Sequence, residues 1–295
     1  MIGGLLLALV SAAVINLGFL LQHRGLARDA SPAPRAGRLR RAFADPTWLS
    51  GQALGWLGFG LQIMAVAIAP LSLVQAFAAG GLALSVPLAA GIFRHPVTRG
   101  QTVAVLAIAA GLAVLPVGFS TGSDRISSGS LIAAMAIGTV IAGALGRMGG
   151  VAARAAAAGI FYGLADAAIK AVSLQWPAHG MAGLVSGWSA VAATGTFAGF
   201  LCFQSALAEG AAVPAISVMT AGTALVALAC GLGAFGESLG ADLPASLVHG
   251  FAIAVVLAAV PALAAAQTTI VQAADHRRER APSRARPVPA VQPPR

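Results

Sequence analysis

The segment Gly159-Ile-Phe-Tyr-Gly-Leu-Ala-Asp-Ala-Ala-Ile-Lys170 lies inside an apolar run that extends from about residue 155 to residue 176. At about 1.5 Å of rise per residue, a helix of this length crosses a hydrocarbon core of about 30 Å. Near its middle are an acid and a base, Asp166 and Lys170, whose i, i+4 spacing places both on one helix face. Because a charge at that depth costs at least about 2.5 kcal/mol, we expect both side chains to face the bundle interior or a hydrated cavity.

The composition is that of a protein embedded in a membrane. Of the 295 residues, 58% are hydrophobic and 9% are charged, which excludes an ordinary soluble globule. The formal net charge of +9 could suggest a nucleic-acid partner, but the basic residues are concentrated in loops and in the tail rather than on one folded face. We therefore expect membrane lipid and a small solute or cation as partners, and no nucleic acid. A homodimer stays open.

Nine apolar runs predict nine membrane-spanning helices in an all-α, polytopic fold. The first run precedes the first charge, Arg24, so we interpret it as a span rather than as a signal peptide. The predicted spans cover residues 2–21, 48–68, 70–93, 100–119, 130–146, 155–176, 181–203, 212–235 and 246–271. Together they form one transmembrane domain over residues 1–271.

The distribution of Arg and Lys predicts the orientation of these spans. With nine spans, 16 of the 18 basic residues fall on one side, mainly in the loop before residue 45 and in the tail 275–295. Since basic loops stay in the cytoplasm, the amino terminus is expected outside the cell membrane and the tail inside. The loop 29–45 and the tail are rich in Pro and Arg and poor in apolar residues, so both are predicted to be disordered.

A faint internal repeat relates the two halves of the chain. Gly58-Phe-Gly-Leu-Gln62, followed by Ala69-Pro70, resembles Gly199-Phe-Leu-Cys-Phe-Gln204, followed by Val213-Pro214. In both copies a glutamine closes one span and a proline opens the next. The copies lie five spans apart and cross in opposite directions, as in inverted-repeat transporters. This predicts that residues 1–120 mirror residues 152–271, with the span 130–146 as a linking helix.

Several of these stretches also resemble a known group of transporters. Asn16-Leu-Gly-Phe-Leu-Leu-Gln-His-Arg-Gly25, Trp56-Leu-Gly-Phe-Gly-Leu-Gln62 and Ala69-Pro70-Leu-Ser-Leu-Val-Gln75 are similar to the drug/metabolite transporter superfamily (EamA-like proteins). Within it, the nearest similarity is to the NIPA-type magnesium transporters, and it continues through Gln204-Ser-Ala-Leu207 and Gly236-Glu-Ser-Leu239.

The resemblance covers roughly residues 2–271 without the arginine-rich loop. It implies a bundle of inverted repeats that moves a small solute by alternating access, without a bound cofactor. The acidic residue that the family carries after the third span is absent, because this chain has Phe93-Arg-His-Pro96 there. The resemblance therefore does not establish magnesium as the substrate.

The residues expected along a solute path, or coupled to transport, are polar groups inside the apolar runs. They are Asp166, Lys170, Tyr162, Asn16, Gln62, Gln75 and Gln204. Asp166 with Lys170 could couple transport to a proton or a cation, or could be a static pair that allows the helix to insert. The amides could line the path or form interhelical hydrogen bonds. A single acid beside a lysine is a poor Mg²⁺ site, and we expect no metal site and no catalytic residues.

The leading hypothesis is a multi-pass transporter for Mg²⁺ or a small metabolite or drug. The alternative is a non-transporting structural or assembly protein of the membrane. A central cavity lined by Asp166 and the glutamines favours transport, whereas a dry, packed centre favours the alternative.

Overall fold

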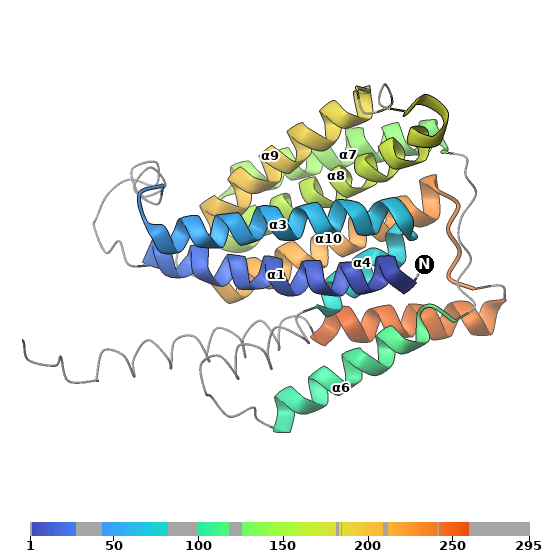
Figure 1. The fold of residues 1–295 in the computed structure, drawn as a ribbon, viewed down its shortest axis with the longest axis horizontal. Coiled ribbons are helices and arrows are strands. Elements are labelled where there is room, and N and C mark those ends of the chain that lie inside the picture. The colour runs from blue at the N-terminus through green and yellow to red at the C-terminus, as the bar shows by residue number, and fades with distance from the viewer. Residues whose placement is uncertain are drawn as a thin grey trace, which may run out of the picture.

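The computed structural model describes residues 2–27, 43–81, 99–117, 126–180, 183, 185–208, 212–240 and 242–259. Every regular element within these ranges is a helix. The labelled helices in Figure 1 are α1 (Ile2–Ala27), α3 (Pro46–Ile68), α4 (Leu71–Gly80), α6 (Arg99–Val114), α7 (Ser128–Met148), α8 (Val151–His179), α9 (Gly187–Leu207) and α10 (Ala212–Ala234). A further helix covers Leu243–Ala259.

The helices and their surface are consistent with a multi-pass membrane protein. Six of them, α1, α3, α7, α8, α9 and α10, are long and apolar enough to cross a membrane. Large apolar side chains are exposed on the outside of the bundle, including Leu57 on α3 and Ile132 and Val140 on α7. Exposed apolar side chains in this number suit lipid rather than water.

Most predicted spans coincide with helices. The runs 130–146, 155–176 and 212–235 lie in α7, α8 and α10, while α9 begins at Gly187, later than the predicted residue 181. The predicted third and ninth spans end outside the described residues. Most of the loop 29–45 and the whole tail 275–295 also lie outside them. The inverted repeat therefore stays a prediction.

Glycines allow the helices of two pairs to approach closely. The antiparallel helices α1 and α3 meet where a Cβ atom on Gly18 would lie 2.7 Å from the Gly51 carbonyl oxygen. The pair α8 and α10 meets in the same way, since a Cβ on Gly159 would lie 2.5 Å from the Met219 carbonyl oxygen. Such close backbone contact is possible because the glycine carries no Cβ atom at the point of contact.

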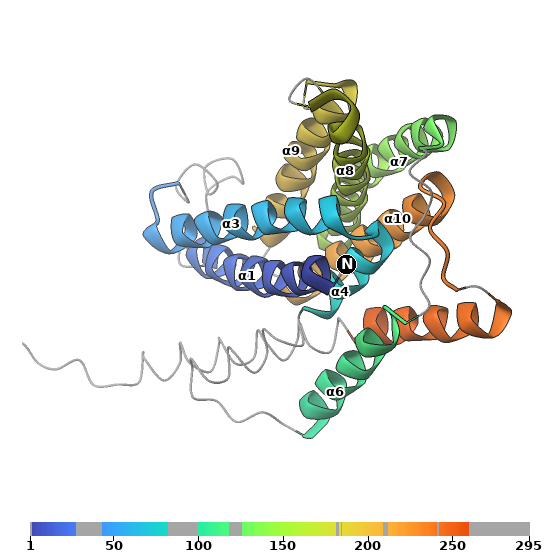
Figure 2. The same ribbon diagram turned by 45° about the vertical axis from the view of Figure 1, so that its right-hand side comes forward.

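The short helix α4 joins the two halves of the bundle. It packs against α1 and α10, while α8 packs against α7, α9, α10 and α3; Figures 1 and 2 show α4 between α1 and α10. Pro70 separates α3 from α4 and starts the new helix, where its missing N–H is not needed. The interpretation of Pro70 as a helix start is confirmed.

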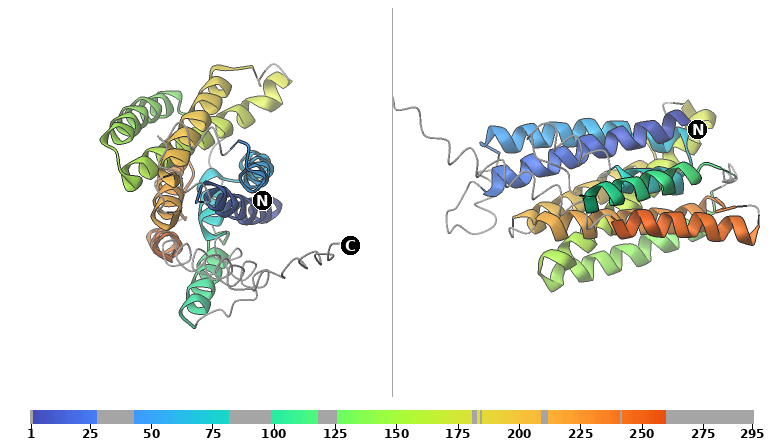
Figure 3. Two further views of the ribbon diagram at one scale, coloured as in Figure 1. Left: turned by 90° about the vertical axis from the view of Figure 1, so that its left-hand side faces the viewer. Right: turned by 90° about the horizontal axis from the view of Figure 1, so that it is seen from below.

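The helix α6 and the helix Leu243–Ala259 lie side by side at one edge of the molecule (Figure 3). A Cβ on Gly111 would lie 3.3 Å from the Ala252 carbonyl oxygen, and Nε2 of His249 lies 2.9 Å from the Val117 carbonyl oxygen. This edge is remote from the cavity described next, whose described lining contains none of these residues.

Candidate functional site

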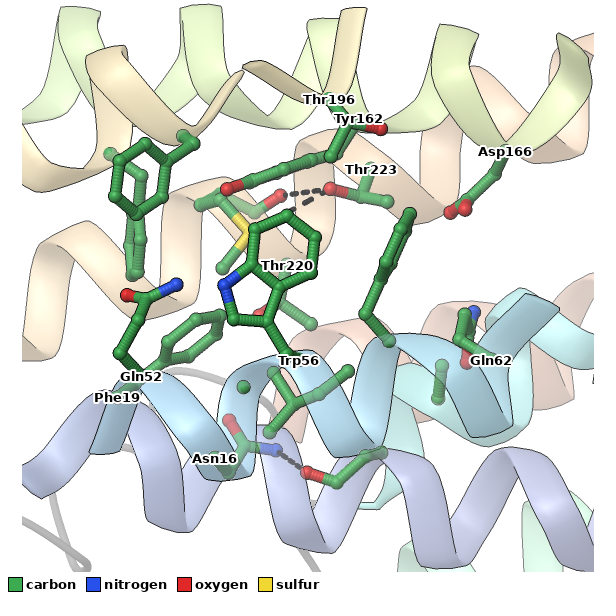
Figure 4. A pocket seen from close by; sticks show the side chains of 18 of the residues that line it. Asn16, Phe19, Gln52, Trp56, Gln62, Tyr162, Asp166, Thr196, Thr220 and Thr223 are labelled. Atoms are coloured by element: carbon green, nitrogen blue, oxygen red, sulfur yellow. Dashed lines mark hydrogen bonds between the residues drawn. The ribbon is translucent and has the colours of Figure 1, made fainter. Parts of the chain in front are cut away.

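A cavity of about 720 Å³ lies between α1, α3 and α4 on one side and α8, α9 and α10 on the other. Figure 4 shows Asn16, Gln52 and Gln62 projecting from α1 and α3, and Tyr162 and Asp166 from the opposite wall. Of the seven residues predicted along the path, six line the cavity: Asn16, Gln62, Gln75, Tyr162, Asp166 and Gln204. Lys170 is not part of the described lining.

Asp166 is held in the cavity wall by an amide from the other half of the bundle. Its side chain is 6% exposed, and Oδ2 accepts a hydrogen bond of 2.6 Å from Nε2 of Gln75 on α4. Tyr162 lies one helical turn before it and lines the same cavity. The expectation that Asp166 faces inward agrees with this burial, and its role in coupling stays a prediction.

Lys170, one turn after Asp166, extends to the end of α3. Its Nζ donates hydrogen bonds to the carbonyl oxygens of Val66, at 3.0 Å, and Ala69, at 2.8 Å. The last carbonyls of a helix lack partners within the helix. The described hydrogen bonds of Asp166 and Lys170 go to two different helices. Mutual neutralisation of the two charges, which their i, i+4 spacing allows, stays a prediction.

Glu237 performs the complementary task at the start of α4. Its carboxylate accepts hydrogen bonds from the backbone N–H groups of Leu71, at 2.6 Å, and Ser72, at 2.8 Å. Pro70 provides no side-chain cap there. Carboxylates are stabilised at helix N-termini because the free N–H groups and the helix dipole favour negative charge.

This role of Glu237 was not predicted from the sequence. A detectable signal was present, because Glu237 is an acid in a loop predicted on the same membrane side as a proline-started helix that has no capping side chain.

Neutral groups join the two halves at the opposite end of the cavity. Nε2 of Gln204 on α9 donates to Oε1 of Gln22 on α1, whose own Nε2 donates to the Gly51 carbonyl oxygen at 3.2 Å. Beside them the rings of Phe19 and Phe203 pack with their centroids 4.5 Å apart. The cavity is therefore bounded by charged contacts to backbone at the Pro70 end and by amide and aromatic contacts at the Gln22 end.

Four buried polar atoms of the lining have no hydrogen-bond partner: Oε1 of Gln52, Oε1 of Gln204, Oγ1 of Thr196 and Nε1 of Trp48. Buried acceptors are nearly always paired in folded proteins, since leaving one unpaired costs free energy. These atoms are therefore available to water or to a ligand in the cavity.

The described residues contain no group of three or more His, Cys, Asp or Glu side chains that could hold a metal ion. Asp166 is the single acid in the described lining. No family model, curated protein or solved structure matches this chain. The functional proposal therefore rests on the cavity and on the contacts that close its ends.

Proposed function

We propose that this chain is a multi-pass membrane transporter that moves a small solute by alternating access. The observation that carries the proposal is the cavity of about 720 Å³, which is lined by buried Asp166 and by amides inside a bundle with an apolar surface. Pockets of about 300–1,000 Å³ are typical of small-molecule sites. Polar side chains are costly in hydrocarbon, so their position around a cavity favours a role in transport.

The contacts between the two halves suit a rocking movement. Lys170 and Glu237 join the halves at the Pro70 end, and Gln204 with Gln22 joins them at the other end. In the orientation predicted from the arginines, the Pro70 end faces outward and the Gln22 end faces the cytoplasm. Opening one end at a time would give each side access to the same cavity, as in inverted-repeat transporters such as the drug/metabolite superfamily that the sequence resembles.

The lining favours an organic solute over Mg²⁺. Magnesium ions bind through carboxylates and retained waters in near-octahedral geometry. The described lining offers one carboxylate, and apolar or aromatic side chains such as Phe59, Ile63 and Phe200 make up much of the remainder. A metabolite-sized or drug-sized molecule is the better fit.

Flux into proteoliposomes tests the proposal. Purified protein is reconstituted and offered a panel of labelled organic amines, organic acids, sugars and Mg²⁺. We expect uptake of at least one organic solute by the wild-type protein and by Asp242→Asn, a variant at an exposed helix cap, and loss of uptake by Asp166→Asn. If correctly folded protein moves none of the solutes, the non-transporting structural or assembly role replaces this proposal.

A further inference from the structure

The lining of the cavity also indicates the chemical class of the solute, an inference that rests on the proposed transport function. We propose that the cavity binds a protonated amine with an apolar body, and that Asp166 receives its ammonium group. Three features of the lining support this assignment: its charge, its surplus of hydrogen-bond acceptors and its aromatic centre.

The charge of the lining favours a monovalent cation. Asp166 is the sole acidic residue of the described lining, which contains no Lys, Arg or His. A carboxylate or phosphate ligand would meet no opposing charge in a site where a buried ion needs compensation. A divalent cation would keep one uncompensated charge. A single ammonium group balances the carboxylate of Asp166.

Three amides of the lining use an N–H group within the protein. Nε2 of Gln75 donates to Asp166, Nδ2 of Asn16 donates to the Ala12 carbonyl oxygen at 2.8 Å, and Nε2 of Gln204 donates to Gln22. Gln204 is 1% exposed, and its Oε1 has no partner. Oε1 of Gln52 is also buried and has no hydrogen-bond partner. The unpaired donor Nε1 of Trp48 also lies in the lining, but the two free amide oxygens outnumber it and favour a ligand that donates hydrogen bonds.

Aromatic side chains lie between the two polar ends. The contact between Gly199 on α9 and Tyr162 on α8 gives a reference point along the cavity, because a Cβ on Gly199 would lie 3.0 Å from the Tyr162 ring. Asp166 is one turn beyond Tyr162 in one direction, and Gln204 is five residues beyond Gly199 in the other. At ~1.5 Å per residue, Asp166 and Gln204 are separated by roughly 13 Å along the helix axes.

Phe19, Phe59 and Trp56 line the cavity; Figure 4 shows Trp56 and Phe19 on the wall facing Tyr162. Aromatic faces accommodate both an apolar body and a nearby ammonium group. The solute is therefore expected to carry its charge at one end, beside Asp166.

Equilibrium dialysis against protein in lipid nanodiscs tests the class directly. The probe is labelled 2-phenylethylamine, which is protonated at neutral pH. Its comparators keep the phenyl ring and the two-carbon chain: phenylacetate reverses the charge, phenylacetamide removes it, and trimethyl(2-phenylethyl)ammonium keeps the charge and removes the donors. We expect the amine to bind at least about tenfold more tightly than each comparator, as for a hydrogen-bonded charge pair. Equal binding of phenylacetamide or phenylacetate overturns the inference, and equal binding of the trimethyl compound overturns the requirement for donors.

Variants connect the binding to the residues. Asp166→Asn and Gln52→Met are each expected to weaken binding of 2-phenylethylamine, the first by about tenfold or more, whereas Asp242→Asn leaves it unchanged. Gln52→Met approximately keeps the side-chain volume, so this variant is expected to fold and to allow the measurement even if Asp166→Asn is unstable. If neither variant weakens binding, the amine is not held by this cavity.

The outcomes separate this inference from the transport function. Amine binding that depends on Asp166, together with no flux of any solute in proteoliposomes, would support the site and overturn transport. Flux of other solutes without amine binding would overturn the amine assignment and leave transport standing.

Discussion

Lys170 shows how a charge inside an apolar helix can be compensated by backbone. Its ammonium group meets the carbonyl oxygens of Val66 and Ala69, where α3 ends. These carbonyls carry the negative end of the helix dipole. A base at this depth therefore stabilises the corner between α3 and α4 through main-chain contacts, whatever Asp166 does in the cavity.

Replacing this base tests the role. Lys170→Met keeps most of the apolar stem and leaves both carbonyl oxygens without the donor. Since hydrogen bonds to charged groups contribute about 1.5–3 kcal/mol, we expect a clearly lower unfolding temperature in detergent, measured by size-exclusion fluorescence after heating. The control is Arg147→Met, because the Arg147 guanidinium bonds the Gly143 carbonyl oxygen on an exposed helix face and should matter little.

A double variant separates this explanation from the i, i+4 pair. If Lys170 serves α3 and Asp166 serves the cavity, the effects of Asp166→Asn and Lys170→Met on stability add. Recovery of stability in the double variant would instead show that the two charges compensate each other and would contradict the assignment of Lys170 to α3.

The sequence predicted part of this site. The depth of Asp166 in an apolar run was sufficient to place it inward, because few environments in a membrane accept a charge. The partner of Lys170 could not be predicted, because i, i+4 spacing describes only its own helix face. Its acceptors come from Val66 and Ala69, about a hundred residues earlier in the chain.

At the scale of elements, the pair α1 and α3 depends on contact between backbones. A Cβ on Gly51 would lie 2.6 Å from the Gly18 carbonyl oxygen, whereas a Cβ on Gly60 of the same helix would have no atom within 4 Å. Gly51 and Gly55 have the i, i+4 spacing of small residues that favours close contact between membrane helices. This spacing did not identify Gly18, because the partner of such a face is set by tertiary packing.

These two glycines give a matched pair of substitutions. Gly51→Val should separate α1 from α3 and destabilise the protein by about 1–3 kcal/mol or more, since overpacked contacts force the backbone to shift. Gly60→Val should change stability little. The measurement is the midpoint of thermal unfolding for both variants prepared in the same detergent. Equal midpoints would mean that α1 and α3 adjust without cost and that their close contact is not required.

At the scale of the molecule, the ends of the bundle agree with the order of the predicted spans. Glu237 and the start of α4 meet at one end, and Gln22 and Gln204 meet at the other, as an alternation of nine spans requires. Which end faces the cytoplasm follows only from the arginines. The inverted repeat could not be tested by this agreement, because the same alternation would arise in bundles without a repeat.

Labelling of single cysteines tests the orientation. In a background with Cys202 and Cys230 replaced, Arg35→Cys and Ala285→Cys should resist an impermeant maleimide applied to intact cells and react after lysis. Asp242→Cys, at an exposed position, should react in intact cells. Reaction of residue 35 or residue 285 from outside would reverse the assignment and place the Pro70 end of the cavity in the cytoplasm.

The way in which Lys170 and Glu237 bind the turn between α3 and α4 determines which sequence changes the turn can tolerate. Lys170 and Glu237 both bind main-chain atoms, those of Val66, Ala69, Leu71 and Ser72. Any side chain of suitable size other than proline, which lacks the backbone N–H, can occupy those four positions without loss of a hydrogen bond. An inserted or deleted residue would move every one of these atoms away from its charge. In related chains, we expect the residue types at this corner to vary while the number of residues between α3 and α4 stays constant.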